Sequence, residues 1–155
     1  MRSTNGGASF TSPVAINSSP GSERAQFFPW VAADETDGTV SAIWYDQRGG
    51  IGTSDLTELV HTHSVNGGLN WSCPAALSDR AFHAEAGNRT SQPNLGDYIQ
   101  CVSQGGTLYT AFAPAQDTRR ASPISGTPFW FLGFESHCSG ARGVEPRLVA
   151  ATLLK

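Results

Sequence analysis

Two Asp-x-Arg triplets are the clearest positions in this sequence at which side chains could bind a charged ligand. Asp46-Gln47-Arg48 and Asp117-Thr118-Arg119 each place a carboxylate two residues before a guanidinium. An arginine can hold a ligand carboxylate through two parallel hydrogen bonds. Pairing of each aspartate with its own arginine is the favoured alternative, because oppositely charged neighbours in one turn satisfy each other. The triplets are therefore candidates for a binding site and, more simply, for a structural turn.

His61 and His63 lie two residues apart and are a candidate pair of metal ligands. Residues two apart share one face of a strand, so two imidazoles there could hold a metal ion. No third ligand of compatible spacing is visible. The sequence therefore favours two solvent-facing strand histidines, and it predicts no metal site and no cofactor.

The three cysteines, Cys73, Cys101 and Cys138, are odd in number and widely spaced, with no CxxC pair. They predict neither a zinc site nor a disulfide framework. Cys101 lies in an apolar run and reads as a small core residue. A Cys73–Cys101 bridge is the alternative.

Charge and hydropathy exclude several classes of partner. The formal net charge is −3 and there is no basic run, which argues against a nucleic-acid partner. No stretch approaches the roughly 20 apolar residues of a membrane helix. The N-terminus lacks the hydrophobic core of a signal peptide, so the chain as encoded is expected in the cytoplasm.

The composition is that of an all-β domain. Hydrophobic residues make up 39% of the 155 residues, and 17 Gly and 9 Pro interrupt the sequence every few positions. Frequent turns suit short strands and would break long helices. The length allows one domain with a real core.

An octet occurs twice, 61 residues apart, as Ser3–Phe10 and Ser64–Trp71. Both copies read Ser-x-Asn-Gly-Gly-x-polar-aromatic, with a Pro three residues after the aromatic residue. Asn-Gly is a strong hairpin signal, because both residues can take positive φ. Ser and Asn side chains can bind turn amides, and the aromatic ring can fold back over the loop. The octets are interpreted as folding elements, with no role in catalysis.

Short strands punctuated by turns surround the second octet. Alternating and aromatic runs predict strands over 28–34, 40–46 and 56–64, followed by a short fourth strand after the octet. A second set is predicted over 96–102, 108–113, 129–135 and 147–154. Four antiparallel strands in about 50–60 residues are typical of one propeller blade.

These octets resemble the Asp boxes, the bacterial neuraminidase repeats of sialidase-like β-propellers, with Asn in place of the usual Asp. The strand pattern around residues 28–48 and the Gly96-Asp97-Tyr98-Ile99 start of the next strand set resemble the same family. The resemblance implies about two to two and a half blades in a single domain. Residues 1–20 would end one blade, 26–80 would form a blade with its octet, and 94–155 a degenerate blade. Members of this family are often secreted.

In such a propeller the octets join strands 3 and 4, on the face opposite the usual sialidase site. The resemblance thus places a tentative ligand-binding set on the other face: Asp46, Arg48, Arg89, Asp97, Tyr98, Asp117 and Arg119. Sialidases use three arginines, a Tyr nucleophile with a Glu, and an Asp acid/base. No positions here match those motifs, so no catalytic residue is assigned. Asp97-Tyr98 is more simply a blade-start motif, and the four Trp residues are more simply core than sugar platforms.

Two functions remain open. The favoured one is a non-catalytic sialidase-like module that binds a glycan or a protein partner. The alternative is an exo-sialidase-type glycoside hydrolase whose site is completed by oligomerisation. Two and a half blades cannot close a ring, so the chain is expected to be a fragment, to self-associate, or to fold as an open partial stack with capped ends. Self-association into a dimer or a larger assembly is favoured.

Overall fold

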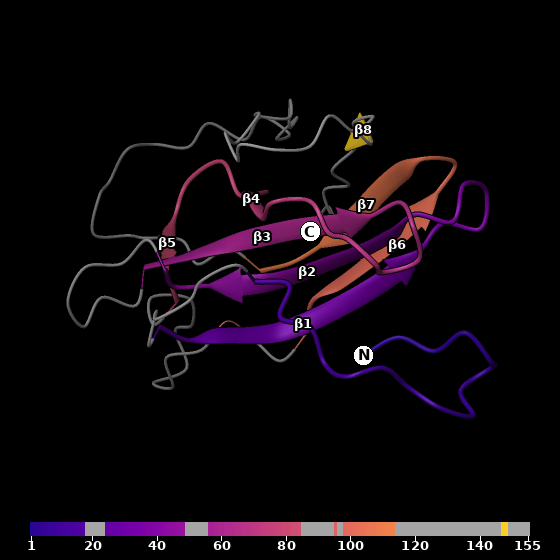
Figure 1. The fold of residues 1–155 in the computed structure, drawn as a ribbon. Coiled ribbons are helices and arrows are strands. Elements are labelled where there is room, and N and C mark those ends of the chain that lie inside the picture. Colours follow the sequence, from indigo (N-terminus) through magenta and orange to yellow (C-terminus); the bar gives the residue numbers. More distant parts are fainter. Residues whose placement is uncertain (18–23, 49–55, 85–94, 96–97, 114–146, 149–155) are drawn as a thin grey trace.

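A computed structural model of the chain describes residues 1–17, 24–48, 56–84, 95, 98–113 and, for the backbone, 147–148. The described elements are all strands, which confirms the all-β prediction. Within the described ranges there is no helix long and apolar enough to cross a membrane. The first sheet follows chain order (Figure 1), with strands β1 (Gln26–Ala33), β2 (Val40–Asp46), β3 (Leu56–Ser64) and β4 (Ala75–Ala76). A short strand, β5 (Phe82–His83), pairs with the start of β3.

The antiparallel pairing of β2 with β3 forms the middle of this sheet. Its register runs without a break from Val40 opposite Ser64 to Asp46 opposite Glu58. Both strands have the bounds predicted from their alternating and β-branched residues. We call the end of the sheet at Ser64 the octet end, and the end at Asp46 the arginine end.

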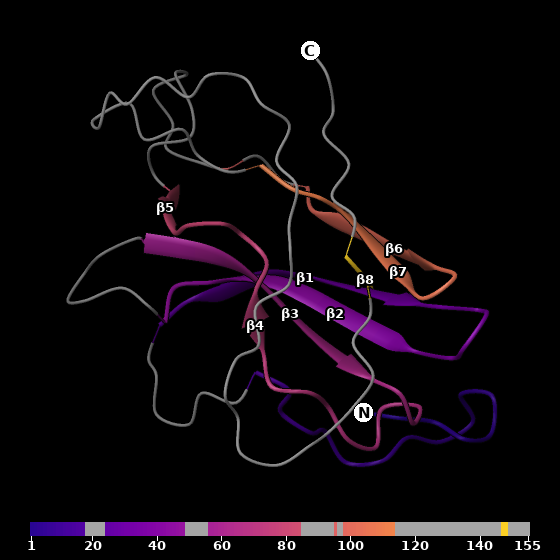
Figure 2. The same ribbon diagram turned by 90° about the horizontal axis from the view of Figure 1, so that it is seen from above.

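Both faces of β2 and β3 are covered. On one face, Ile43 and Tyr45 of β2 and Leu59 of β3 belong to a core shared with β6 and β7. On the other face, Trp44 packs against Ile16 of the N-terminal segment. Figure 2 shows the first sheet lying between the β6–β7 pair and residues 1–17. The sheet is thus the middle of three layers.

The second sheet consists of β6 (Gln100–Gln104), β7 (Thr107–Ala111) and β8 (Arg147–Leu148). β6 and β7 form an antiparallel hairpin, as predicted, but β8 pairs with β7 in the parallel direction. This departs from the expected antiparallel four-stranded blade. The 112–146 connection has the dozen or more residues that a parallel crossover needs. The predicted strand 129–135 lies outside the described residues.

The two sheets approach each other most closely along β1 and β6. Asp34, directly after β1, contacts Ser103 and Gly106 at the end of β6. Tyr45, near the end of β2, contacts Ala113, just beyond β7. The corresponding ends of the two sheets therefore coincide, and β1 and β6 run in the same direction.

The second octet forms the turn between β3 and β4. Ser64 Oγ accepts a hydrogen bond from the Gly68 amide at 2.8 Å, and Asn66 Oδ1 accepts one from the Asn70 amide at 2.9 Å. Ser64 Oγ also donates to Asn66 Oδ1 at 3.0 Å. Two side chains thus satisfy the amides of one tight loop.

The first octet repeats this arrangement. Ser3 Oγ accepts from the Gly7 amide at 2.9 Å, Asn5 Oδ1 accepts from the Ser9 amide at 3.0 Å, and Ser3 Oγ donates to Asn5 Oδ1 at 2.9 Å. Equivalent atoms make equivalent bonds in both copies. The repeat seen in the sequence is therefore also a repeat of local structure.

The turn residues differ from the sequence-based expectation. Positive φ occurs at both glycines of each octet, 66° and 84° at Gly67 and Gly68, while neither octet asparagine has positive φ. The asparagines instead use their side chains to accept amide hydrogen bonds, which requires no left-handed backbone. A Cβ on Gly68 would lie 3.8 Å from the Trp71 ring, so the aromatic residue does fold back over the loop.

β1 contains the one non-glycine residue with positive φ in the described ranges, Phe28 at 52°. The β1–β2 register shifts between Phe27 and Trp30, on either side of Phe28-Pro29. Pro29 has no amide to donate, and Phe28 lies in a backbone region that L-residues rarely adopt. The first half of β1 is therefore a strained bulge.

Candidate functional site

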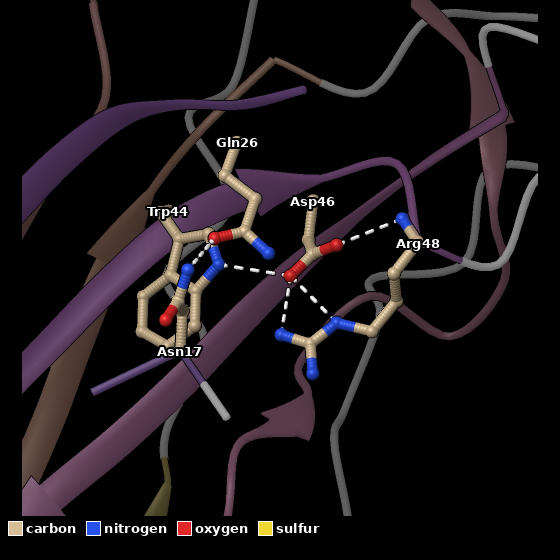
Figure 3. A network of polar contacts seen from close by, with 5 residues as sticks. All are labelled: Asn17, Gln26, Trp44, Asp46 and Arg48. Atoms are coloured by element: carbon tan, nitrogen blue, oxygen red, sulfur yellow. Dashed lines mark hydrogen bonds and ion pairs between the residues drawn. The ribbon is translucent and has the colours of Figure 1, made fainter. Parts of the chain in front are cut away.

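The first Asp-x-Arg triplet forms a closed pair at the arginine end (Figure 3). Asp46 is buried, and its Oδ1 accepts a hydrogen bond from the Arg48 amide at 2.8 Å. Its Oδ2 accepts from Arg48 Nε at 2.7 Å, from Arg48 Nη2, and from Trp44 Nε1 at 3.0 Å. The aspartate of this triplet therefore pairs with its own arginine, which is the structural interpretation that the sequence favoured.

The electrostatics of Asp46 are those of a stable carboxylate. Burial alone would raise its pKa, but hydrogen bonds from the side chain and backbone of Arg48, together with the Trp44 indole and the Arg48 charge, hold the pKa below its ordinary value. The Arg48 side chain is 28% exposed, and its third guanidinium nitrogen points away from Asp46 in Figure 3. Arg48 therefore has limited capacity left for a ligand.

Two amides lie beside this pair. Asn17 donates a hydrogen bond to Gln26, which is paired with Asp46 across β1 and β2. Figure 3 shows both side chains next to Trp44. Sequence reasoning did not identify Asn17 or Gln26, because their contact joins the N-terminal segment to β1.

Tyr45 connects the two sheets at the same end. Its hydroxyl donates to the Ala113 carbonyl at 3.2 Å and accepts from the Ala113 amide at 3.1 Å. Burial raises the pKa of Tyr45, although the hydrogen bond with Ala113 opposes this. A buried, neutral phenol held by a backbone group is a structural residue.

Tyr98 has a different environment. It precedes β6, at the arginine end, and it is 88% exposed. A blade-start residue that bonds a neighbouring sheet would be buried, so the structure does not support that interpretation for Tyr98. Its ring is free to contact a partner molecule.

The three tryptophans that the structure describes occupy three kinds of position, and Trp130 lies outside the described residues. Trp44 is buried, Trp71 is half-buried against the core of the Trp44 face, and Trp30 on β1 is 42% exposed. The first two fit the core interpretation. Trp30 is exposed because β1 is bulged and, among the described strands, pairs with β2 alone.

Four members of the predicted ligand-binding set lie outside the described residues: Arg89, Asp97, Asp117 and Arg119. Of the others, Asp46 and Arg48 are brought together, and Tyr98 lies at the same end of the molecule. The set therefore remains a prediction.

Asp34 is a buried polar residue that sequence reasoning missed. At the octet end its Oδ2 accepts hydrogen bonds from the Gly106 amide at 2.8 Å and from Ser103 Oγ at 3.1 Å, while its Oδ1 accepts from the Thr36 amide at 2.8 Å. The Thr36 amide bond, followed by those from Gly106 and Ser103, lowers the pKa of Asp34 despite its burial. Its position directly after a predicted strand and just before the Asp37-Gly38 turn is the sequence signal that could have identified Asp34.

His61 contradicts the prediction of solvent-facing histidines. It is 8% exposed, because it shares the face of Ile43 and Leu59 that is turned toward the second sheet. His63 is half-buried, and the two rings are stacked with centroids 5.7 Å apart. Among the described residues, no three His, Cys, Asp or Glu side chains are grouped as metal ligands.

The cysteines also differ from expectation. Cys73 is disulfide-bonded, whereas Cys101 is a free, buried thiol, so the alternative Cys73–Cys101 bridge is wrong. Burial raises the pKa of Cys101 to about 11. The prediction of a small core residue holds for Cys101, and the prediction of no disulfide fails for Cys73.

In comparisons with protein-family models, curated proteins and solved structures, the chain matches none.

Proposed function

We propose that this chain is part of a sialidase-like β-propeller and that it acts as a non-catalytic glycan-binding module. Two features support the fold. The octets share one hydrogen-bond pattern. The sheets also approach most closely along their first strands, which run in the same direction. Adjacent blades of a propeller have that relation, because their first strands surround a common axis.

The observation that carries the non-catalytic assignment is the closed Asp46–Arg48 pair. A sialidase-type grip on a sugar carboxylate needs an arginine whose guanidinium is free to bind it. Here Nε and Nη2 of Arg48 both donate to Asp46. Release of Arg48 would leave the buried Asp46 carboxylate with less compensation, which is costly.

Tyr98 supports a glycan as the ligand class. An exposed aromatic ring can pack against the apolar face of a sugar. Tyr98 lies at the arginine end, opposite the octet turns that close the hairpins. We therefore place glycan contact at the arginine end, centred on Tyr98.

A glycan array with the full chain tests this function. Binding is expected for the wild type and is lost in Tyr98→Ala. Tyr109→Ala is the matched control, since Tyr109 lies in the middle of β7 and is also exposed. An array without signal, or one on which Tyr98→Ala binds as the wild type does, would refute the assignment.

A fluorogenic sialoside assay tests the hydrolase alternative. The non-catalytic proposal predicts no turnover above that of heat-denatured protein. Turnover that disappears in Arg119→Ala, with an unchanged circular dichroism spectrum, would establish the exo-sialidase-type function instead.

We also propose that copies of the chain self-associate. Trp30 and Val31 are exposed on β1, and an exposed apolar edge strand favours pairing with another chain. Light scattering should give a dimer or a larger assembly, and Val31→Lys should shift it toward the monomer. A wild-type monomer at all concentrations would contradict self-association.

A further inference from the structure

The His61–His63 pair contains a buried nitrogen without a hydrogen-bond partner. Among the described residues, His61 Nε2 is the one buried side-chain nitrogen or oxygen in that condition. Leaving such a group unpaired costs on the order of 1–3 kcal/mol, so each case needs a physical explanation. A water molecule or a bound ion would supply one.

The surroundings of His61 do not provide a protein partner through the sheet. Its cross-strand neighbours are Ile43 on β2 and Ala75 on β4, and neither side chain has a polar atom. Along β3, the adjacent residue on the same face is His63, whose ring is nearly parallel to that of His61, at 14°. The second imidazole is therefore the nearest polar side chain that shares this face of β3.

The protonation state of His61 suits ligation. Burial, and then the repulsion of His63, lowers the pKa of His61 to about 4, and burial lowers the pKa of His63 as well. Both rings are therefore neutral at pH 7.5. A neutral ring keeps its proton on one nitrogen and has a lone pair on the other.

We propose that His61 and His63 form a two-imidazole binding site for Zn²⁺ on the inner face of β3. Imidazole nitrogen is a preferred zinc ligand, and bonds of about 2.0–2.1 Å would place the two nitrogens no more than about 4 Å apart. Rings whose centroids are 5.7 Å apart must therefore tilt toward each other. Water molecules would complete the tetrahedral coordination.

The competing explanation is a buried water molecule bound to His61 Nε2. It leaves His63 without a role and predicts no change when zinc is added. The two explanations therefore differ in the response of both rings to the metal.

The test is a Zn²⁺ titration of the full chain at pH 7.5, followed by calorimetry and by nitrogen NMR of the histidine side chains. We expect one zinc ion per chain, with resonance shifts at both His61 and His63. His63→Asn should weaken binding by at least about tenfold, because it removes one of two linked ligands. His61→Asn should have the same effect.

His83→Asn is the matched control, since His83 lies on β5 at the opposite end of β3 and should leave zinc affinity unchanged. Because His63 is half-buried, its variant remains informative if substitution of His61 disrupts folding. Zinc affinity that survives His63→Asn, or resonances of both rings that do not shift with zinc, would overturn the proposal.

Discussion

Two buried aspartates at opposite ends of the first sheet have different kinds of partner. Asp34, at the octet end, accepts hydrogen bonds from groups 69 and 72 residues away on the second sheet. Asp46, at the arginine end, accepts side-chain bonds from Trp44 and Arg48, each two residues away. The buried carboxylate of the octet end therefore joins the two sheets, while the carboxylate of the arginine end is satisfied within its own strand and turn. At the arginine end the sheets are joined instead by the hydrogen bonds between Tyr45 and the Ala113 backbone.

Asp34→Ala is the strongest test of the difference between the long-range partners of Asp34 and the local partners of Asp46. The substitution removes the buried carboxylate that accepts hydrogen bonds from the Gly106 and Thr36 amides and from Ser103 Oγ, so we expect a larger fall in thermal unfolding temperature than for Tyr45→Phe or for either octet variant. Differential scanning calorimetry measures it. A fall smaller than that caused by Tyr45→Phe would show that Asp34 does not hold the two sheets together.

The pH dependence of stability tests whether His61, in the half of β3 near the octet end, is buried in the folded chain. Because the pKa of folded His61 is lowered from 6.5 to about 4, the unfolded chain binds a proton there between these pH values and the folded chain does not. Stability should therefore fall as the pH falls through this window, by about 3 kcal/mol at its lower end. The lowered pKa values of Asp34 and Asp46 reduce stability only when the pH falls below 3.8, the ordinary pKa of an aspartate.

Urea unfolding between pH 7.5 and pH 4.5 measures this effect. In His61→Leu the dependence should become shallower, because the buried ionisable group is gone. An unchanged slope in His61→Leu would mean that His61 is accessible to protons in the folded state.

The two octets have the same hydrogen-bond pattern in different surroundings, so the same substitution in each can be compared. Asn66→Ala removes the acceptor of the Asn70 amide in a turn that joins two paired strands, and should cost about 1–2 kcal/mol of global stability. Asn5→Ala removes the same bond in an exposed N-terminal segment, which can open locally, and should cost less than about 0.5 kcal/mol. Chemical denaturation of both variants gives the comparison, and equal losses would show that the N-terminal octet is part of the cooperative unit.

Tyr45→Phe is the smallest expected perturbation of the arginine end. It removes the two hydrogen bonds with the Ala113 backbone and keeps the packing of the ring, so we expect a loss of about 1 kcal/mol. Glycan binding should be unchanged, because Tyr98 is not affected. Loss of binding in Tyr45→Phe would mean that the second sheet must be held at this end for the site to exist.

Local patterns predicted much of the first sheet. The alternation in 40–46 and 56–64 defined β2 and β3 at their observed bounds, and the repeated octet located two identical turns. Both kinds of signal depend on residues close in the sequence. The pairing of Asp46 with Arg48 was foreseeable for the same reason.

Long-range contacts explain what the sequence did not predict. The role of Asp34 depends on a hairpin about 70 residues later, and the burial of His61 depends on the second sheet covering its face. The parallel pairing of β8 likewise requires a partner far away in the chain. The exposure of Tyr98 and the strain at Phe28 follow from how the strands meet, which no local pattern encodes.

Inter-sheet nuclear Overhauser effects in the full chain report on the relative placement of the two sheets, on which the proposed fold depends. We expect cross-peaks between residues 33–34 and 103–106, between Tyr45 and Ala113, and between Ile43 and Cys101. We expect none between β4 and the β6–β7 pair. Cross-peaks from β4 to β6 or β7, together with none from Asp34 to Gly106, would contradict two sheets that meet along β1 and β6.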